Sequence, residues 1–274
     1  MPEPAGALFN SLLELMARLR GPGGCPWDRE QTRDSLKPFL IEEAYEVIEA
    51  LESGQREALL EELGDLLFQV MFHTQLAREL SEFSMTDVLE HLLAKMTRRH
   101  PHVFGDRTVS SAREALSQWE AIKHAEGSGE GKPRSVLDGV PRNLPALLRA
   151  QRLQVKAARV GLDWQSAQAA WAKVQEEVSE ANAALARGDH AKVREEFGDL
   201  LFSLVNVARL LDIDAEGGLQ AAVEKFRRRF ELMEAEVTAN GGSLSDMPLE
   251  ELDRVWERAK CRDGDPPGGR GAEP

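Results

Sequence analysis

Several features that mark common protein classes are scarce in this sequence. Its 274 residues include only two cysteines, which lie far apart and outside any CxxC pair. This excludes a zinc ribbon, a dithiol redox site and a disulfide-stapled scaffold. No run approaches the ~18 apolar residues that cross a bilayer, and Met1 to Arg20 lacks a basic segment followed by a continuous apolar one. We therefore expect a soluble cytoplasmic protein without a membrane partner.

Basic residues are also in deficit. Lys and Arg total 34 against 47 Asp and Glu, which gives a formal net charge of −13. Because phosphate neutralisation needs a basic surface, we expect no direct binding of nucleic acid. Any phosphate chemistry would need bound cations or a local basic patch.

Strand-forming residues are few, with four Ile, one Tyr and six Thr, while Ala, Leu, Glu and Arg dominate. Apolar residues recur at helical spacing from Ala167 to Leu185, where Asp163 is the expected N-cap and Gly188 the expected stop. The composition predicts an all-α protein. Further helices are expected near 8–20, 34–53, 55–80, 86–99, 111–125, 141–160, 189–212, 215–239 and 248–260. Residues 106–111 could form a loop or a short strand.

The chain contains an internal repeat. EELGDLLFQV at 61–70 returns as EEFGDLLFSL at 195–204, and EEAYE at 42–46 returns as EEVSE at 176–180, both displaced by 134 residues. A repeat this long indicates two copies of one helical domain rather than a solenoid. We expect domains at 1–126 and 136–262, joined by a flexible linker at 127–135, and a disordered tail at 263–274.

Each repeat carries four acidic residues in helical register. In the second repeat these are Glu177 and Glu180 on one helix, and Glu196 and Asp199 on the next. If the two helices pack antiparallel, the four carboxylates converge and need a cation to offset their repulsion. Oxygen ligands without His or Cys favour Mg²⁺ or Mn²⁺. Glutamates on a helix are more commonly solvated, but apolar residues around Asp199 predict that its carboxylate is buried.

A basic run, Lys225 to Arg229, follows in the second repeat. Lys225, Arg228 and Arg229 share one helix face, which predicts either a solvated basic face or a clamp for a polyphosphate. Trp256 either packs in the core at a helix end or stacks on a base.

These motifs resemble the MazG family of nucleoside triphosphate pyrophosphohydrolases in its two-domain bacterial form. The resemblance rests on EExxE followed by ExxD in both repeats, and on GGCPWDREQT at 23–32, RRHPHVFGD at 98–106 and GDLLFSLVNVARL at 198–210. It covers roughly residues 7–259. It implies two tandem helical-bundle domains, a homodimer, and Mg²⁺-dependent cleavage of nucleoside triphosphates to nucleoside monophosphate and pyrophosphate.

The resemblance also implies roles for particular residues in the second repeat. The metal ligands would be Glu177, Glu180, Glu196 and Asp199, and nucleotide contacts would come from Lys173, Lys192, Lys225, Arg227, Arg228, Arg229 and Trp256. From the chemistry of the neighbouring carboxylates, we expect Glu176 or Glu195 to act as the general base. Glu43, Glu46, Glu62 and Asp65 would form a second metal site in the first repeat. Because Phe39 and Ala58 replace the two lysines Lys173 and Lys192 there, we expect the second repeat to be the catalytic one.

Two other classes of function compete with a hydrolase. One is a regulatory protein whose acidic cluster binds nucleotide or metal without turnover. The other is a helical interaction protein whose carboxylates are merely solvated. Pyrophosphate release would exclude both of these classes, and stabilisation by Mg²⁺ would exclude the second.

Overall fold

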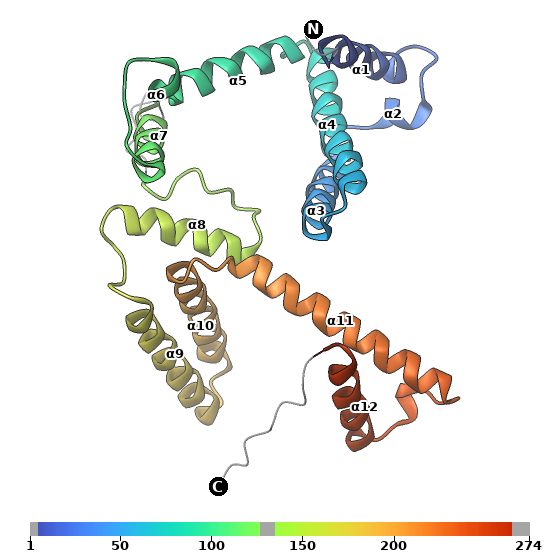
Figure 1. Ribbon diagram of the computed structural model, residues 1–274, viewed down its shortest axis with the longest axis vertical. Coiled ribbons are helices and arrows are strands. Elements are labelled where there is room, and N and C mark those ends of the chain that lie inside the picture. The colour runs from blue at the N-terminus through green and yellow to red at the C-terminus, as the bar shows by residue number, and fades with distance from the viewer. Residues whose placement is uncertain (1–4, 127–134, 265–274) are drawn as a thin grey trace. The chain divides into compact units, whose positions relative to one another are not determined.

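The computed structural model describes residues 5–126 and 135–264. The chain divides into two compact units, Met1–Gly131 and Lys132–Pro274. Within the described ranges the regular structure is helical, with no strands (Figure 1). This confirms the all-α prediction. None of the described helices is long and apolar enough to cross a membrane.

The first unit is organised around an antiparallel helix pair. Its helices are α1 (Ala5–Arg20), α2 (Pro26–Glu30), α3 (Lys37–Ser53), α4 (Arg56–Glu79), α5 (Met85–Arg99), α6 (Pro101–Phe104) and α7 (Ala112–Glu126). Helix α3 ends at Gly54, whose φ of 67° lies in the left-handed region that glycine adopts without strain, so the chain can reverse into α4. Buried Met16, Leu36, Met71 and Phe72 join α1 to this pair.

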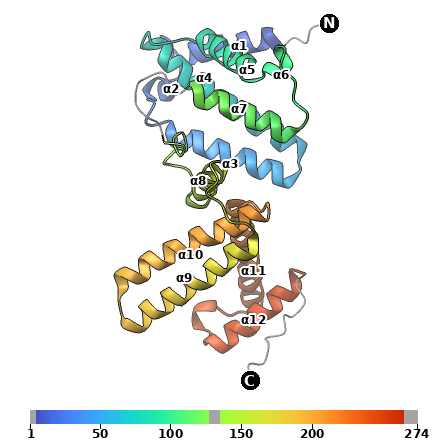
Figure 2. The ribbon, with the colours of Figure 1, turned by 90° about the vertical axis from the view of Figure 1, so that its left-hand side faces the viewer.

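The second unit repeats this plan. It contains α8 (Ala146–Arg159), α9 (Ala167–Arg187), α10 (His190–Leu210), α11 (Ala215–Ala239), the short η2 (Leu244–Asp246) and α12 (Leu249–Arg262). Helices α9 and α10 form an antiparallel hairpin, side by side in Figures 1 and 2. As in the first unit, a glycine with positive φ, Gly188, ends the first helix of the pair.

A second core lies between α11 and α12. It consists of Met233, Val237, Val255 and Ala259, and Trp256 packs against it from a partly buried position. Helix α11 leads from the end of the hairpin to α12, which lies beside its C-terminal half (Figure 1). The hairpin and the α11–α12 pair therefore offer two separate surfaces within this unit.

Three local predictions were wrong. The N-cap of α9 is Ser166, whose hydroxyl accepts a bond from the Ala169 N–H at 3.2 Å, while Asp163 pairs with the poorly exposed guanidinium of Arg209. The helix expected from residue 141 begins at Ala146, because the conformation of Pro145 suits the position before a helix and not its interior. Asp263 is not part of a disordered tail, since it caps α12.

The structure also bears on the shorter segments of the chain. Residues 106–111 contain no strand, which resolves the choice in favour of a loop. The short helices α2 and α6 were not predicted, because four or five residues give no periodic pattern. The linker expected at 127–135 and the tail beyond Gly264 fall almost wholly outside the described residues.

Candidate functional site

The hairpin of the second unit brings three predicted metal ligands together. Glu177 on α9, and Glu196 and Asp199 on α10, each offer a carboxylate oxygen, and these oxygens lie within 4.8 Å of one another. The hairpin explains the convergence, because residues three apart share a helix face and the antiparallel pairing sets the two faces opposite each other. Glu180, the fourth expected ligand, lies outside this group of three.

Burial within the cluster is uneven. Glu177 and Glu196 are 4% and 2% exposed, whereas Asp199 is exposed. The prediction that Asp199 is buried was therefore wrong. Apolar neighbours along a sequence do not bury a residue when those neighbours face outward themselves, as Phe197, Leu201 and Phe202 do here.

Two lysines pair with the buried carboxylates. The Lys173 ammonium lies 2.8 Å from Glu177, and the Lys192 ammonium lies 2.8 Å from Glu196, each pair one helical turn apart. Each lysine also reaches an exposed glutamate, Glu176 at 2.8 Å and Glu195 at 3.1 Å. Each of these two lysines thus bridges one buried and one exposed carboxylate, and the two ammonium groups offset part of the negative charge of the hairpin.

The pKa values of these groups follow from that arrangement. The negative charge of Glu196, together with burial, raises the pKa of Glu180. The bond from Lys192 lowers the pKa of Glu196, and the paired glutamates raise the pKa of Lys173 and Lys192. A neighbouring cation would oppose this rise in the pKa of Glu180.

The donor set suits a hard divalent cation. All the converging atoms are carboxylate oxygens, and neither His nor Cys belongs to the group. Oxygen-only donors of this kind match Mg²⁺ or Mn²⁺ better than Zn²⁺. A divalent cation would also offset the repulsion that now raises the pKa of Glu180.

The basic run lies elsewhere in the unit, on α11. Arg227 pairs with Glu224 and Glu231 on its own helix, at 2.8 and 2.6 Å. Arg228 and Arg229 both pair with Asp263 at the end of α12. None of these three acidic partners belongs to the cluster on α9 and α10.

Trp256 accompanies the run rather than the acidic cluster. Its ring centroid lies 5.3 Å from that of Phe226, and its side chain packs on the α11–α12 core. Lys225 is exposed on α11. Within one chain, the expected phosphate contacts on α11 therefore lie near Trp256 and on a different helix from the expected metal ligands. Lys173 and Lys192 are the exceptions, because they pair with the acidic cluster.

The first unit holds a similar but differently balanced cluster. Oxygens of Glu43, Glu62 and Asp65 lie within 4.8 Å of one another. Burial and neighbouring carboxylates raise the pKa of both Glu46 and Glu62. The Gln69 amide donates to Glu43 at 3.3 Å.

The position equivalent to Lys173 has a different use in the first unit. Phe39 packs edge-on against Trp27, with ring centroids 5.8 Å apart and planes at 82°. It also contacts the buried core of the unit. The first cluster therefore lacks the ammonium group that neutralises Glu177 in the second.

Two acidic residues at the ends of α7 and α12 were not predicted. Glu126 binds Arg98 and Arg99, and Asp263 binds Arg228 and Arg229. A signal was present in the sequence, because Trp119 and Glu126 recur as Trp256 and Asp263, both displaced by 137 residues. The displacement between matching residues is 134 in the hairpins, 130 from Arg98 to Arg228, and 137 here, and these changes hide the last part of the repeat.

Comparison with known proteins agrees with the geometry. The profile of the MazG nucleotide pyrophosphohydrolase domain matches residues 31–104 and 165–232, once in each unit. A nucleoside triphosphate pyrophosphohydrolase/pyrophosphatase MazG of Thermotoga maritima is 46% identical over 94% of this chain and 98% of its own length.

Two further relatives have similar names. A nucleoside triphosphate pyrophosphohydrolase of Escherichia coli strain K12 is 45% identical over 94% of this chain and 98% of its own length. One of Mycolicibacterium smegmatis is 34% identical over 92% of this chain and 66% of its own length. The twofold domain match and the relatives of nearly equal length place this chain in the MazG nucleotide pyrophosphohydrolase family.

Proposed function

We propose that this protein is a Mg²⁺-dependent nucleoside triphosphate pyrophosphohydrolase, which converts a nucleoside triphosphate and water to the monophosphate and pyrophosphate. The observation that carries the proposal is the all-carboxylate cluster on α9 and α10. The names of the full-length relatives from Thermotoga maritima and Escherichia coli support it. Substrates of this kind would place the enzyme in the cytoplasm, where it would clear or regulate nucleotide pools.

The four carboxylates Glu177, Glu180, Glu196 and Asp199 would hold the cation. The bound cation would polarise phosphate oxygens and lower the pKa of a water molecule. Glu176 or Glu195 would accept the proton of the attacking water, since both are exposed and lie within a helical turn of the metal ligands. Lys173 and Lys192, which now pair with the cluster, would turn toward the phosphates once the cation takes over their role.

Attack at the α-phosphorus would release pyrophosphate, whose negative charge must be stabilised as it leaves. Lys225, Arg227, Arg228 and Arg229 would supply that charge, and Trp256 would contact the base. This solves the difficulty of an anionic substrate for a chain of net charge −13. The first-unit cluster of Glu43, Glu46, Glu62 and Asp65 would bind a second cation without turnover, because Phe39 and Ala58 supply no ammonium group.

We further propose a homodimer. On α10, the apolar side chains of Phe197, Leu201 and Leu204 are exposed at helical spacing, and on α9 those of Trp171, Val178 and Leu185 are exposed likewise. A two-helix hairpin cannot bury such stripes alone, but two hairpins can bury them in a four-helix arrangement. A second chain would also bring another basic run toward each cluster.

A pyrophosphate-release assay tests the activity. With Mg²⁺, we expect pyrophosphate and monophosphate in equal amounts from at least one of a panel of canonical, deoxy and modified nucleoside triphosphates. Excess EDTA should abolish the reaction, and Mn²⁺ should restore it, because the ligands are all carboxylates. Full activity in EDTA would contradict the metal assignment, and no release from any substrate would favour binding without turnover.

A further inference from the structure

The two unpredicted acidic residues occupy the same place in each unit. In the second unit, Asp263 accepts bonds from Arg228 Nη2 at 3.0 Å and from Arg229 Nε at 2.9 Å. In the first unit, Glu126 accepts bonds from Arg98 Nε at 2.7 Å and from Arg99 Nη2 at 2.7 Å. A carboxylate at the end of the last helix therefore bridges two adjacent arginines in both copies.

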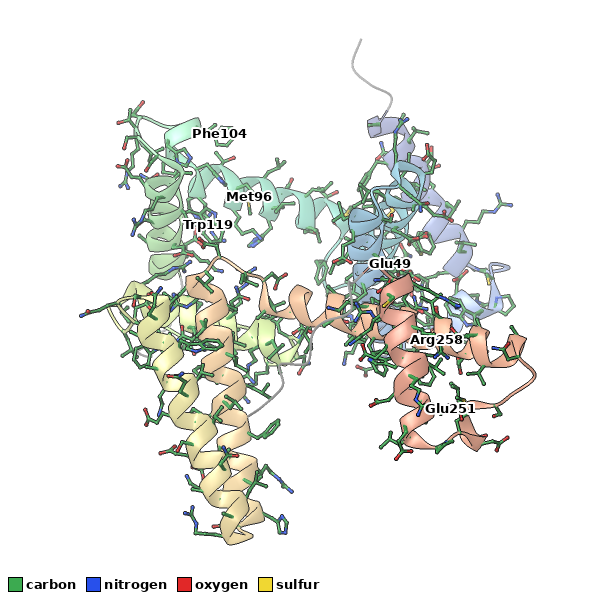
Figure 3. All side chains as sticks on the ribbon, turned by 60° about the horizontal axis from the view of Figure 1, so that its bottom comes forward. Glu49, Met96, Phe104, Trp119, Glu251 and Arg258 are labelled. Carbon is green, nitrogen blue, oxygen red and sulfur yellow. The ribbon has the colours of Figure 1, made fainter. Side chains whose placement is uncertain are left out.

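Both sides of this contact recur in the sequence. Arg98 and Arg99 match Arg228 and Arg229, at the end of the basic segment of each repeat. The helices that present the carboxylates share Trp-Glu-x-x-Lys, at Trp119 on α7 (labelled in Figure 3) and at Trp256 on α12. In both copies the carboxylate follows the tryptophan by seven residues, which is two helical turns.

The two arginines at Asp263 differ in their access to solvent. The side chains of Arg229 and Asp263 are both 8% exposed, whereas that of Arg228 is 55% exposed. The buried pair has the character of a fixed link between α11 and α12. When Arg228 leaves Asp263 and rotates into solvent, Asp263 keeps its bond from Arg229.

A carboxylate between two guanidinium groups has the chemistry of a bound phosphate. Each presents two oxygens on one central atom, which accept paired N–H bonds from an arginine. The two arginines hold the pKa of Asp263 at about 2, so the group is an anion at neutral pH. Arg228 directs both Nε and Nη2 at it, which are the atoms that a phosphate would use.

We propose that Asp263 is a built-in competitor for the phosphate chain of the substrate. It holds the guanidinium of Arg228 until a triphosphate, or the pyrophosphate product, draws that guanidinium away, while Arg229 keeps Asp263 in place. This inference rests on the proposed function, in so far as that function assigns Arg228 to the phosphates. If Asp263 competes with the phosphate chain, removal of its charge should increase the affinity for phosphates. If Asp263 is only a structural link, the affinity should stay the same or fall.

Asp263→Asn in the full-length protein tests this sign, because it removes the charge and nearly keeps the shape. We expect the KM for the nucleoside triphosphate to fall about two- to fivefold, the equivalent of one ion pair with an exposed arginine, with kcat unchanged. Glu126→Gln is the matched control, since the same contact in the first unit should leave KM unchanged. Asp263→Glu, which restores the residue type of the first unit, should behave like the wild type.

Calorimetric titration with inorganic tripolyphosphate in EDTA provides a readout that needs no turnover. Asp263→Asn should bind it more tightly than the wild type, and the gain should vanish when Arg228→Lys is also present, because the competition acts through that guanidinium. An unchanged or weaker affinity in Asp263→Asn, with a lowered melting temperature, would overturn the proposal in favour of a structural link. Failure of the wild type to release pyrophosphate would count against the proposed function alone, since the titration is independent of it.

Discussion

The two acidic clusters can be tested separately by substitutions that remove one carboxylate charge at a time. Glu180→Gln and Asp199→Asn each remove one charge from the second cluster and nearly preserve side-chain shape. We expect either change to abolish pyrophosphate release, a loss of at least about a hundredfold. The same substitutions in the first cluster, Glu46→Gln and Asp65→Asn, should leave most of the activity.

A melting curve with and without Mg²⁺ should accompany these assays. Loss of one carboxylate relieves repulsion, so the metal-free variants should melt no lower than the wild type while the Mg²⁺-dependent rise shrinks. Loss of activity in the first-cluster variants together with retained activity in the second-cluster variants would reverse the assignment of the catalytic copy.

At the residue scale, the sequence predicts which side chains lie together better than it predicts whether each of them is buried. The spacing predicts that four carboxylates converge if the two helices pack antiparallel, and three of them, Glu177, Glu196 and Asp199, do so, because helix periodicity fixes which side chains share a face. Their burial was not predictable in the same way. Whether Asp199 is covered depends on how far the partner helix extends over it, and that is a property of tertiary packing.

At the scale of the element, the α9–α10 hairpin depends on its two lysines when no metal is present. Lys192 lowers the pKa of Glu196, so this carboxylate stabilises the fold above its ordinary pKa near 4.5, and the contribution is lost as pH falls below that value. In Lys192→Met, burial would instead raise the pKa of Glu196. Its contribution then reverses sign, and stability should increase as pH falls from 7 toward 5.

Thermal melting in EDTA across this pH range measures the difference. At pH 7 we expect Lys192→Met to melt several degrees below the wild type, with much of the loss recovered at pH 5 or on addition of Mg²⁺. Lys37→Met is the control, because Lys37 and its partner Asp34 are both well exposed and lie outside the cluster. Equal melting temperatures for the two variants at pH 7 would show that Lys192 does not act as a counter-ion.

Helix existence was predicted more accurately than helix ends. The apolar stripe from Ala167 to Leu185 and the stop at Gly188 agree with α9. The start was misplaced, because Asp163, Ser166 and their neighbours offer several capping groups, and only the packed structure shows that Asp163 serves Arg209. The α11–α12 contact through Asp263 joins residues 34 and 35 apart, a separation at which no local pattern applies.

At the scale of the whole molecule, the exposed stripes on α9 and α10 predict the oligomeric state. Multi-angle light scattering at micromolar concentration should give about 61 kDa, twice the 30.4 kDa of one chain. Leu201→Glu should shift the protein toward the monomer, because a charge in a buried apolar stripe must be desolvated. Leu249→Glu, which alters a residue 74% exposed at the start of α12, should leave the mass unchanged. A wild-type mass near that of one chain would contradict the proposal.

The two positions of the first unit that match Lys173 and Lys192 differ in how well they would accept a lysine. Phe39 supports the first core against Trp27, while its counterpart Lys173 serves the acidic cluster. A designer who wished to give the first copy the charge pattern of the second could not begin at residue 39, because a lysine there would leave the Trp27 ring without its partner. Residue 58 is the better starting point. Ala58 lies one helical turn before Glu62 on a half-buried face, so a lysine there could reach that carboxylate without displacing a core side chain.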